Sequence, residues 1–329
     1  MVSRVAALAG VAGLVALAVS PLVAQTARPA ELGPNELGRV MILEYHKVDH
    51  PEERWTRTPA NFRRDLQRLW ERGYRTVGLG DYLNGKIALP KGTTPLILTF
   101  DDSSPGQFRY IEKNGGWEID PDCAVGILEQ FEREHPEFGH AATFYVLPGA
   151  SPPNRLFNQP DLVGKKLAYL KSRGYEIGNH TLWHANLAKY DETVVRKQLL
   201  EAQEWVQRHL PGFRFRTLAL PMGSYPKELS WAISGGPQGA GYRHDAILMV
   251  AGGAALSPHA RGFDPYHLPR IQATEAELGY WINYFDQRPD ERYVSDGDVA
   301  TVTVPGGKIA MVRPPGGARV LERPSPPSR

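Results

Sequence analysis

The chain alternates short apolar runs with longer segments in which apolar residues recur every three or four positions. Runs of the first kind predict β-strands, and spacing of the second kind predicts helices. A helix is expected from Pro59, capped by Thr58 and stopped by Gly73. The other expected helices cover residues 122–134, 162–173, 192–209 and 275–285. The expected strands cover residues 40–43, 74–77, 96–100, 141–147, 175–178, 217–220 and 246–250.

This alternation of strands and helices predicts an α/β protein whose parallel strands are joined by crossover helices. At least six such strand–helix units favour a single barrel, complete or distorted. An open doubly wound sheet is the main alternative.

The ends of the chain differ from its middle. Arg4 precedes the apolar stretch 5–19, and Leu22-Val23-Ala24 offers a cleavage site, so residues 1–24 are expected to be a secretory signal peptide. Because the apolar segment approaches the ~20 residues that span a bilayer, an uncleaved N-terminal anchor is the alternative. Either form predicts an exported protein, secreted or extracytoplasmic, that meets the membrane only through this segment.

The rest of the chain is expected to divide into three parts. Residues 25–38 read as a Pro-rich linker and residues 39–290 as the catalytic domain. Residues 291–329 form a C-terminal extension rich in Pro, Gly and Arg, which predicts a largely disordered tail.

Charge and cysteine content narrow the chemistry. The formal net charge is only +2, which argues against a nucleic-acid surface and favours an uncharged or mixed substrate. Cys123 is the only cysteine, which excludes an internal disulfide and a cysteine metal cluster. Any metal site must therefore use histidines and carboxylates.

Polar residues gather where the predicted strands end, namely at His46, Asp101, Asp102, His180 and His184. Both candidate folds carry their active sites at this edge. One carboxylate and two imidazoles suit Zn²⁺ with open positions, and the two histidines face one ion if the segment after Asn179 turns helically.

Neighbouring residues of an ideal strand point to opposite faces. The strand that carries Asp101 and Asp102 must therefore end or bend at Asp101 for both carboxylates to share a site. Ser103, Ser104 and Pro105 supply such a break.

Five stretches together resemble the polysaccharide deacetylase family, also called the NodB-homology domain or carbohydrate esterase family 4. They occur in the family's order and within residues 40–285: Leu43-Glu-Tyr-His-Lys-Val48, Thr99-Phe-Asp-Asp102, His180-Thr-Leu-Trp-His184, Leu218-Ala-Leu-Pro-Met-Gly223 and Leu268-Pro-Arg-Ile271. The resemblance implies a distorted (β/α) barrel and metal-dependent removal of N-acetyl or O-acetyl groups from a glycan.

The same resemblance assigns roles to residues. It makes Asp102, His180 and His184 the ligands of a divalent metal, with Zn²⁺ as the expected ion and Co²⁺ or Ni²⁺ as alternatives. It makes Asp101 the general base, and it suggests an oxyanion hole from backbone N–H groups near Met222 and Gly223. The implied substrate is an acetylated polysaccharide of the cell envelope or an exopolysaccharide, most often N-acetylated.

The chain departs from the family pattern at three points. Ser103 stands where the family has Gly, and residues 219–223 lack the arginine that orients the base, for which Arg270 is the candidate replacement. The late histidine that protonates the leaving amine has no clear match. The candidates for that role are His46, His259 and His267, and His46 has the best argument because it ends the first strand.

Other functions stay open at this level. The departures favour, as an alternative, a catalytically inactive glycan-binding protein on the same barrel. Two histidines and one carboxylate also hold Fe²⁺ in oxygenases, although the βα context argues against that class. Trp117, Trp183 and Tyr225 are candidates for stacking on sugar rings, and each is also a common packing residue.

Overall fold

The structure is a computed structural model that describes residues 33–313 and 317–324. The predicted signal or anchor, residues 1–24, lies outside the described residues. Within them, no helix is both long and apolar enough to cross a membrane.

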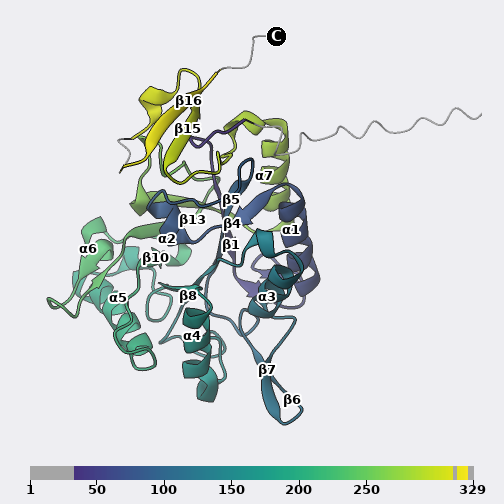
Figure 1. The fold of residues 1–329 in the computed structure, drawn as a ribbon. Helices are drawn as coiled ribbons and strands as arrows, with labels where there is room; N and C mark the ends of the chain where they lie inside the picture. The colour runs from purple at the N-terminus through teal and green to yellow at the C-terminus, as the bar shows by residue number, and fades with distance from the viewer. Residues whose placement is uncertain (1–32, 314–316, 325–329) are drawn as a thin grey trace, which may run out of the picture.

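A closed ring of seven parallel strands forms the centre of the described chain (Figure 1). Around the ring these are β1 (Met41–Tyr45), β14 (Leu268–Gln272), β13 (Ala246–Gly252), β10 (Thr217–Ala219), β9 (Glu176–Asn179), β8 (Thr143–Val146) and β5 (Thr94–Phe100). Pairing of β1 with β5, Leu43 opposite Leu98, closes the ring. The predicted barrel is thus confirmed, and the open sheet is excluded.

One strand of the same sheet lies outside this ring. The short β4 (Tyr74–Thr76) pairs with the first half of β5, and β8 pairs with the second half. Two strands therefore share one edge of β5, which makes the barrel a distorted one. The strand β14 was absent from the predicted strands because Pro269 and Arg270 interrupt its apolar pattern.

Helices surround the ring (Figure 1). They are α1 (Pro59–Glu71), α2 (Leu79–Leu83), α3 (Ala124–Glu134), α4 (Val163–Ser172), α5 (Glu192–Gln207), α6 (Leu229–Ile233) and α7 (Glu275–Gln287). The Thr58 side chain accepts a hydrogen bond from the Asn61 amide at 3.3 Å, as predicted for the N-cap of α1. The predicted helices therefore all appear, with ends that differ by a few residues at most.

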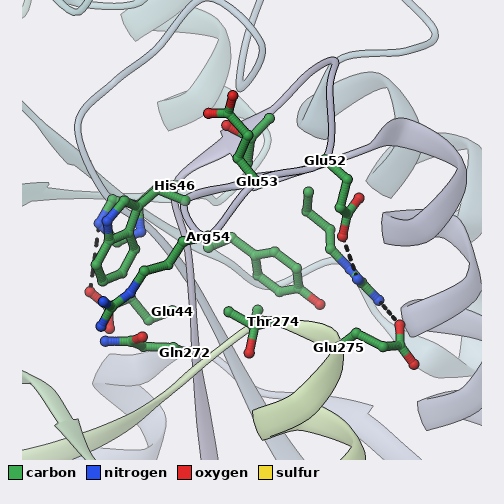
Figure 2. A pocket seen from close by; sticks show the side chains of 13 residues that line it. Glu44, His46, Glu52, Glu53, Arg54, Gln272, Thr274 and Glu275 are labelled. Carbon is green, nitrogen blue, oxygen red and sulfur yellow. Dashed lines mark hydrogen bonds and ion pairs between the residues drawn. The ribbon is translucent and has the colours of Figure 1, made fainter.

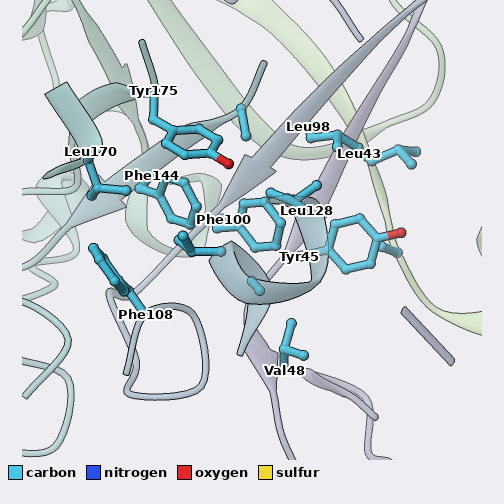
Figure 3. Packing of buried hydrophobic residues seen from close by; sticks show 14 of the residues in the cluster. Leu43, Tyr45, Val48, Leu98, Phe100, Phe108, Leu128, Phe144, Leu170 and Tyr175 are labelled. Atoms are coloured by element: carbon cyan, nitrogen blue, oxygen red, sulfur yellow. The ribbon is translucent and has the colours of Figure 1, made fainter. Parts of the chain in front are cut away.

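Alternate residues of each strand face the helices or the barrel interior. Leu43 and Tyr45 of β1 and Leu98 and Phe100 of β5 join the large core under the helices, where Phe100 stacks between Tyr45 and Phe144 at centroid distances of 5.4 and 4.9 Å (Figure 3). The intervening positions of β1 and β5 face the barrel interior. This parity sends Glu44 and Asp101 inward.

Two segments for which no helix or strand was predicted contain short strands. The polar segment 103–120 contains a hairpin of β6 (Tyr110–Lys113) and β7 (Gly116–Ile119), and the Gly-rich segment 234–241 is closed by β11 (Ser234–Gly235) and β12 (Tyr242–Arg243). Both pairs are antiparallel.

The tail also differs from its prediction. Residues 301–305 and 319–323 form the parallel strands β15 (Thr301–Pro305) and β16 (Arg319–Arg323), so disorder does not hold for these residues. The segment before the barrel is packed too, because Glu36 is buried and accepts a hydrogen bond from the Thr303 amide at 2.8 Å. The part of the expected linker nearest the barrel is thus joined to the C-terminal extension.

A left-handed turn follows β8. Four consecutive residues, Leu156–Gln159, have φ between 45° and 66°, a conformation that costs L-residues about 1–2 kcal/mol each. The buried Lys166 amine of α4 donates to the carbonyls of Phe157 and Asn158 at 2.8 and 3.2 Å. These bonds hold the turn closed.

Burial lowers the pKa of Lys166 to about 7, below the 10.5 of a solvated lysine. Between these values the unfolded state binds more protons than the folded state. The contribution of Lys166 to the free energy of unfolding therefore rises with pH, by at most about 1.4 kcal/mol per pH unit.

We expect Lys166→Met to have a smaller rise in unfolding free energy from pH 6 to pH 9 than the unmodified protein. Urea denaturation at several pH values measures this difference. Lys165→Met is the matched control, because Lys165 is exposed on the same helix. Equal pH dependence in Lys166→Met and the unmodified protein would contradict the account.

Candidate active site

The predicted metal ligands meet at the carboxyl ends of β5 and β9. The Asp102 Oδ1 atom lies 3.4 Å from His180 Nε2 and 3.5 Å from His184 Nε2, and the three ligand atoms lie within 4.8 Å of one another. His180 is buried, whereas the His184 side chain is 36% exposed. One side of the cluster is therefore open.

Local backbone geometry turns Asp102 into this site. The strand β5 ends at Phe100, Asp101 keeps the inward parity of Ile97 and Thr99, and Asp102 has a φ of 79°. This left-handed conformation reverses the direction that Asp102 would have on a continued strand. The predicted break after the strand is thus confirmed.

The residue that replaces the family's glycine takes part in this bend. Ser103 also has positive φ, at 46°, which a glycine would adopt without cost. Its buried hydroxyl donates to the Asn154 carbonyl at 2.7 Å and accepts from the Leu147 amide at 3.0 Å. These bonds tie the loop after β8 to the turn at Asp102, so Ser103 is accommodated in this bend.

The two histidines are brought together by a turn at residues 181–183, and not by the helical turn that the sequence left as a condition. The Asn179 side chain accepts from the Thr181 amide at 2.9 Å, and both Thr181 and His184 have positive φ. The His180 Nδ1 atom lies 2.8 Å from the Ala219 carbonyl. Because that carbonyl can only accept, Nδ1 carries a proton and Nε2 presents its lone pair to the site.

The cluster fits a divalent cation. Both Asp102 Oδ1 and His180 Nε2 are buried atoms that lack a hydrogen-bond partner within the described chain. Buried polar atoms rarely stay unpaired, and these two lie 3.4 Å apart. A carboxylate oxygen and imidazole nitrogens are the donors that Zn²⁺ takes in catalytic sites.

Asp101 lies beside this cluster and is held by Arg270 of β14. The guanidinium donates to both carboxylate oxygens, at 2.8 and 2.7 Å, and both side chains are buried. Burial by itself would raise the pKa of Asp101, but the Arg270 charge and hydrogen bonds outweigh it and hold this pKa well below its usual range. Arg270 therefore stands where the sequence placed a substitute for the missing arginine.

Arg270 also contacts a residue that sequence reasoning missed. It donates to Glu44 Oε1 at 3.2 Å, while Glu44 Oε2 is buried and lacks a hydrogen-bond partner among the described residues. Burial raises the pKa of Glu44 to about 8, although Arg270 opposes this shift. The sequence signal that could have identified Glu44 was a single acidic residue inside the otherwise apolar run of β1.

We expect Arg270→Met to lower the free energy of unfolding by about 3–5 kcal/mol, because it leaves Asp101 and Glu44 buried without their positive partner. Denaturant titration measures the change. Arg64→Met is the control, since Arg64 makes an exposed pair with Glu275 that is worth at most about 1 kcal/mol. Equal losses in the two variants would contradict the assignment of a buried charge network.

His46 lies at the same end of the barrel as the cluster. The other two candidates for the general acid, His259 and His267, do not line the cavities at this end. His46 Nε2 is 3.8 Å from Glu44 Oε1, and its ring meets that of Trp55 at a centroid distance of 4.5 Å. Burial lowers the pKa of His46 despite the nearby aspartates. His267 is exposed and pairs with Asp264, and His259 is buried beside Gly85.

The remaining candidates are dispersed. Trp183 is exposed at 42% and Trp117 is exposed on β7, while the Tyr225 hydroxyl donates to the Tyr266 carbonyl. The Gly223 amide donates to the Leu220 carbonyl, which leaves the Met222 amide as the oxyanion candidate. Cys123 is buried, and burial raises its thiol pKa to about 11, in keeping with a packing role.

A cavity of about 340 Å³ opens over the cluster. Its lining residues are His46, Lys47, Trp55, Asp102, Asn154, His184, Met222 and Val250. A second cavity of similar size shares Lys47, Asp102, Asn154 and His184 with it and continues toward residues 147–153. We call the first the central cavity and the second the Asn154 cavity.

Comparison with known proteins gives a consistent result. The family model described as polysaccharide deacetylase matches residues 89–235. A curated chitooligosaccharide deacetylase of Bradyrhizobium sp. (strain ANU 289) is 24% identical over 138 residues, which is 42% of this chain and 50% of that protein. The chain thus matches about half the length of that curated relative.

Solved structures share the fold. The deacetylase PplD of Streptococcus pyogenes, in complex with acetate, gives a TM-score of 0.55 at 18% identity, covering 74% of this chain and 97% of PplD. IcaB from Ammonifex degensii gives 0.53 at 18% identity, with the same shares covered. BC0361, a polysaccharide deacetylase from Bacillus cereus, gives 0.54 at 17% identity, covering 74% of this chain and 69% of its own.

At these identities the solved structures support the barrel fold only. The family model supports the relationship of the sequence to polysaccharide deacetylases. The resemblance carried by the five sequence stretches is confirmed. Residues 89–235 of this chain match the polysaccharide deacetylase family.

Proposed function

We propose that this protein is an exported, metal-dependent deacetylase that removes acetyl groups, chiefly N-acetyl groups, from a glycan of the cell envelope or an exopolysaccharide. The observation that carries the proposal is the convergence of Asp102, His180 and His184, with two unpartnered buried atoms, beside the ionised Asp101. Export rests on the signal-like residues 1–24, which lie outside the described residues.

Asp102, His180 and His184 would hold the cation. When bound, a divalent ion of the Zn²⁺, Co²⁺ or Ni²⁺ type supplies Lewis acidity, which polarises the acetyl carbonyl and lowers the pKa of a water molecule. The open side of the cluster faces the central cavity, where the acetyl group would enter.

Asp101 would act as the general base. Its carboxylate is ionised, and Arg270 fixes the direction of its oxygens, so it can accept a proton from the attacking water. The water oxygen bonds to the acetyl carbon, the bond from that carbon to nitrogen breaks, and the nitrogen leaves with a proton. The products are acetate and a free amine.

His46 is the side chain placed to deliver that last proton. It lines the central cavity together with Asp102 and His184. Its lowered pKa makes it neutral in the free site at neutral pH. His46 can therefore protonate the leaving nitrogen only after it has gained a proton during the reaction.

The parallel barrel adds to the case against an Fe²⁺ oxygenase, because sites of that class typically lie in antiparallel double-sheet folds. A catalytically inactive glycan-binding protein remains the competing function. The sequence departures that motivated this alternative carry less weight, because Ser103 is accommodated in the turn at Asp102 and Arg270 holds Asp101.

Acetate release decides between the two functions. The purified, metal-loaded protein is incubated with chitooligosaccharides, poly-N-acetylglucosamine, peptidoglycan fragments and acetylated xylan, and free acetate is measured. We expect release from at least one N-acetylated glycan, loss on chelation and recovery with Zn²⁺ or Co²⁺. Oligosaccharide binding without acetate release from any of these glycans would favour the binding protein.

A further inference from the structure

The C-terminal extension lies at the amino ends of the barrel strands. The Thr94 hydroxyl, at the start of β5, donates to the Tyr293 carbonyl at 2.8 Å. Two residues earlier, the Gly92 amide donates to the Ser295 carbonyl at 2.9 Å. In Figure 1 the strands β15 and β16 lie at the top, whereas the β6–β7 hairpin, which follows the carboxyl end of β5, lies at the bottom. The extension and the barrel mouth with its metal-ligand cluster are therefore at opposite ends of the protein.

Exposed apolar side chains gather on this extension. Ile309 and Met311 lie on the short 3-10 helix η8 (Ile309–Met311) and are 48% and 56% exposed. Leu321 is exposed on β16, and η8 contacts this strand. Exposed apolar side chains that group together, unlike scattered ones, mark a site of contact with another molecule or a membrane. We call Ile309, Met311 and Leu321 the apolar patch.

Cationic side chains surround the apolar patch. Arg319, Leu321 and Arg323 alternate along β16 and therefore share one face of it. The intervening Val320 packs against the small core of the extension. The described part of residues 301–324 carries four cationic side chains and one carboxylate, and these are Lys308, Arg313, Arg319, Arg323 and Glu322. An anionic surface would therefore be attracted to this part of the protein.

A cavity of about 310 Å³ next to η8 has the same charge. Its described lining residues include Lys86, His259 and Arg313 and no carboxylate. Arg313 follows η8 by two residues, and its amide donates to the His259 carbonyl at 2.8 Å. The cavity can therefore accept an anionic group such as the phosphate of a lipid headgroup.

The N-terminal segment enters at the same end. A side-chain carbon placed on Gly33, the first described residue, would lie 2.8 Å from the Arg323 guanidinium at the end of β16. The connection from Ala24, the last residue of the expected signal or anchor, to Gly33 can span at most about 30 Å. An uncleaved anchor would therefore hold the extension, and not the mouth, next to the bilayer.

The mouth carries the opposite charge on the side of the β1–α1 loop. Four carboxylates and two guanidinium groups line a cavity there, and they belong to Glu44, Glu52, Glu53, Glu275, Arg54 and Arg57 (Figure 2). This excess of carboxylates would repel an anionic surface. The charges at the two ends therefore favour one orientation of the barrel at such a surface.

We propose that the apolar patch and the cations around it bind the surface of a bilayer that contains anionic lipids, with Ile309, Met311 and Leu321 among the lipid headgroups. The barrel mouth then faces away from the bilayer. This contact is additional to the N-terminal segment, which was the expected link to the membrane. The inference goes beyond the proposed function, because it concerns how the barrel is held and not the reaction.

Vesicle co-sedimentation tests the proposal. The chain from residue 25 onward is used, because residues 33–313 and 317–324 build the barrel and the extension, and because the apolar stretch 5–19 would bind vesicles by itself. We expect this chain to bind vesicles made of equal parts of phosphatidylcholine and phosphatidylglycerol. Met311→Asp and Arg319→Glu should each weaken binding by at least about fivefold, the factor that one favourable charge contact at a lipid surface contributes.

Each variant has a matched control at the opposite end of the barrel. Met222, at the central cavity, is 55% exposed, nearly as much as Met311. Lys189 is an exposed cation on η4 (Leu187–Lys189), which follows the carboxyl end of β9. Met222→Asp and Lys189→Glu should bind the vesicles as the unmodified chain does.

A fluorescent label extends the test to the full chain. Met311→Cys and Met222→Cys each supply one accessible thiol for a fluorophore, because Cys123 is buried. The full chain is reconstituted in the same vesicles, to which lipids that carry a nitroxide quencher are added. These lipids should quench the label at position 311 and leave the label at position 222 bright.

The outcomes are distinct. Equal vesicle binding by Met311→Asp and Met222→Asp, or no binding by the unmodified chain, would overturn the proposal. A dimer in solution that Met311→Asp dissociates would instead assign the apolar patch to a second copy of the chain, and would overturn it as well. None of these measurements depends on acetate release, so each leaves the proposed function untouched.

Discussion

Asp101→Asn is expected to lower kcat/KM for acetate release by about 10²–10⁴-fold, the usual contribution of a general base. The amide keeps the size of the carboxylate but cannot accept the proton of the attacking water. Zn²⁺ affinity should change little, because Asp101 is not one of the three converging ligands. Acetate assays and metal titration of the same preparation measure both quantities.

The matched control is Asp120→Asn. Asp120 also pairs with an arginine, Arg109, and it does not line the central cavity. Its variant should keep full activity, which shows that loss of an aspartate–arginine pair alone does not stop turnover. Unchanged turnover in Asp101→Asn would refute the proposed base.

Asp102→Ala is expected to weaken Zn²⁺ binding by more than about 100-fold and to abolish acetate release. Loss of residues that merely support metal ligands already costs about 10–100-fold in affinity, so loss of a ligand should cost more. Zinc affinity is measured by competition with a chelator of known strength. Chelation of the unmodified protein should reproduce the loss of activity, and added Zn²⁺ or Co²⁺ should reverse it.

Asp264→Ala controls for the removal of an aspartate beside a histidine. Asp264 lies 2.7 Å from His267 at an exposed position, and it lines neither the central cavity nor the Asn154 cavity. This variant should bind Zn²⁺ as the unmodified protein does. If Asp102→Ala retained both zinc and activity, the metal site would have to lie elsewhere.

Much of the site was predictable because it depends on strand parity and on short motifs. Alternate positions of β1 and β5 face inward, so the side chains of His46 and Asp101 could be placed at the barrel mouth from the sequence. The five family-like stretches then indicated which polar residues to group. The parallel barrel and its placement of these residues follow from the same alternation.

Glu44 and Trp55 escaped this reasoning. Glu44 shares the parity of His46, and an acid within a buried strand was a usable signal. Trp55 lies in a loop with no periodic pattern, and its position depends on the ion pairs of Arg57 with Asp65 and Glu275. Such partners are separated by up to 218 positions, so sequence spacing does not reveal them.

The sequence by itself determined the alternation of parallel strands and helices, the inward strand positions and a candidate set of histidines and carboxylates for a metal, because these depend on local periodicity and residue chemistry. Only the tertiary structure decided that pairing of β1 with β5 closes the barrel, that Asp102 turns inward through a positive φ, and that Arg270 on β14 reaches Asp101 just after β5. The physical reason is that the backbone conformation at Asp102 and the pairing of Arg270 are set by contacts between segments that are distant along the chain.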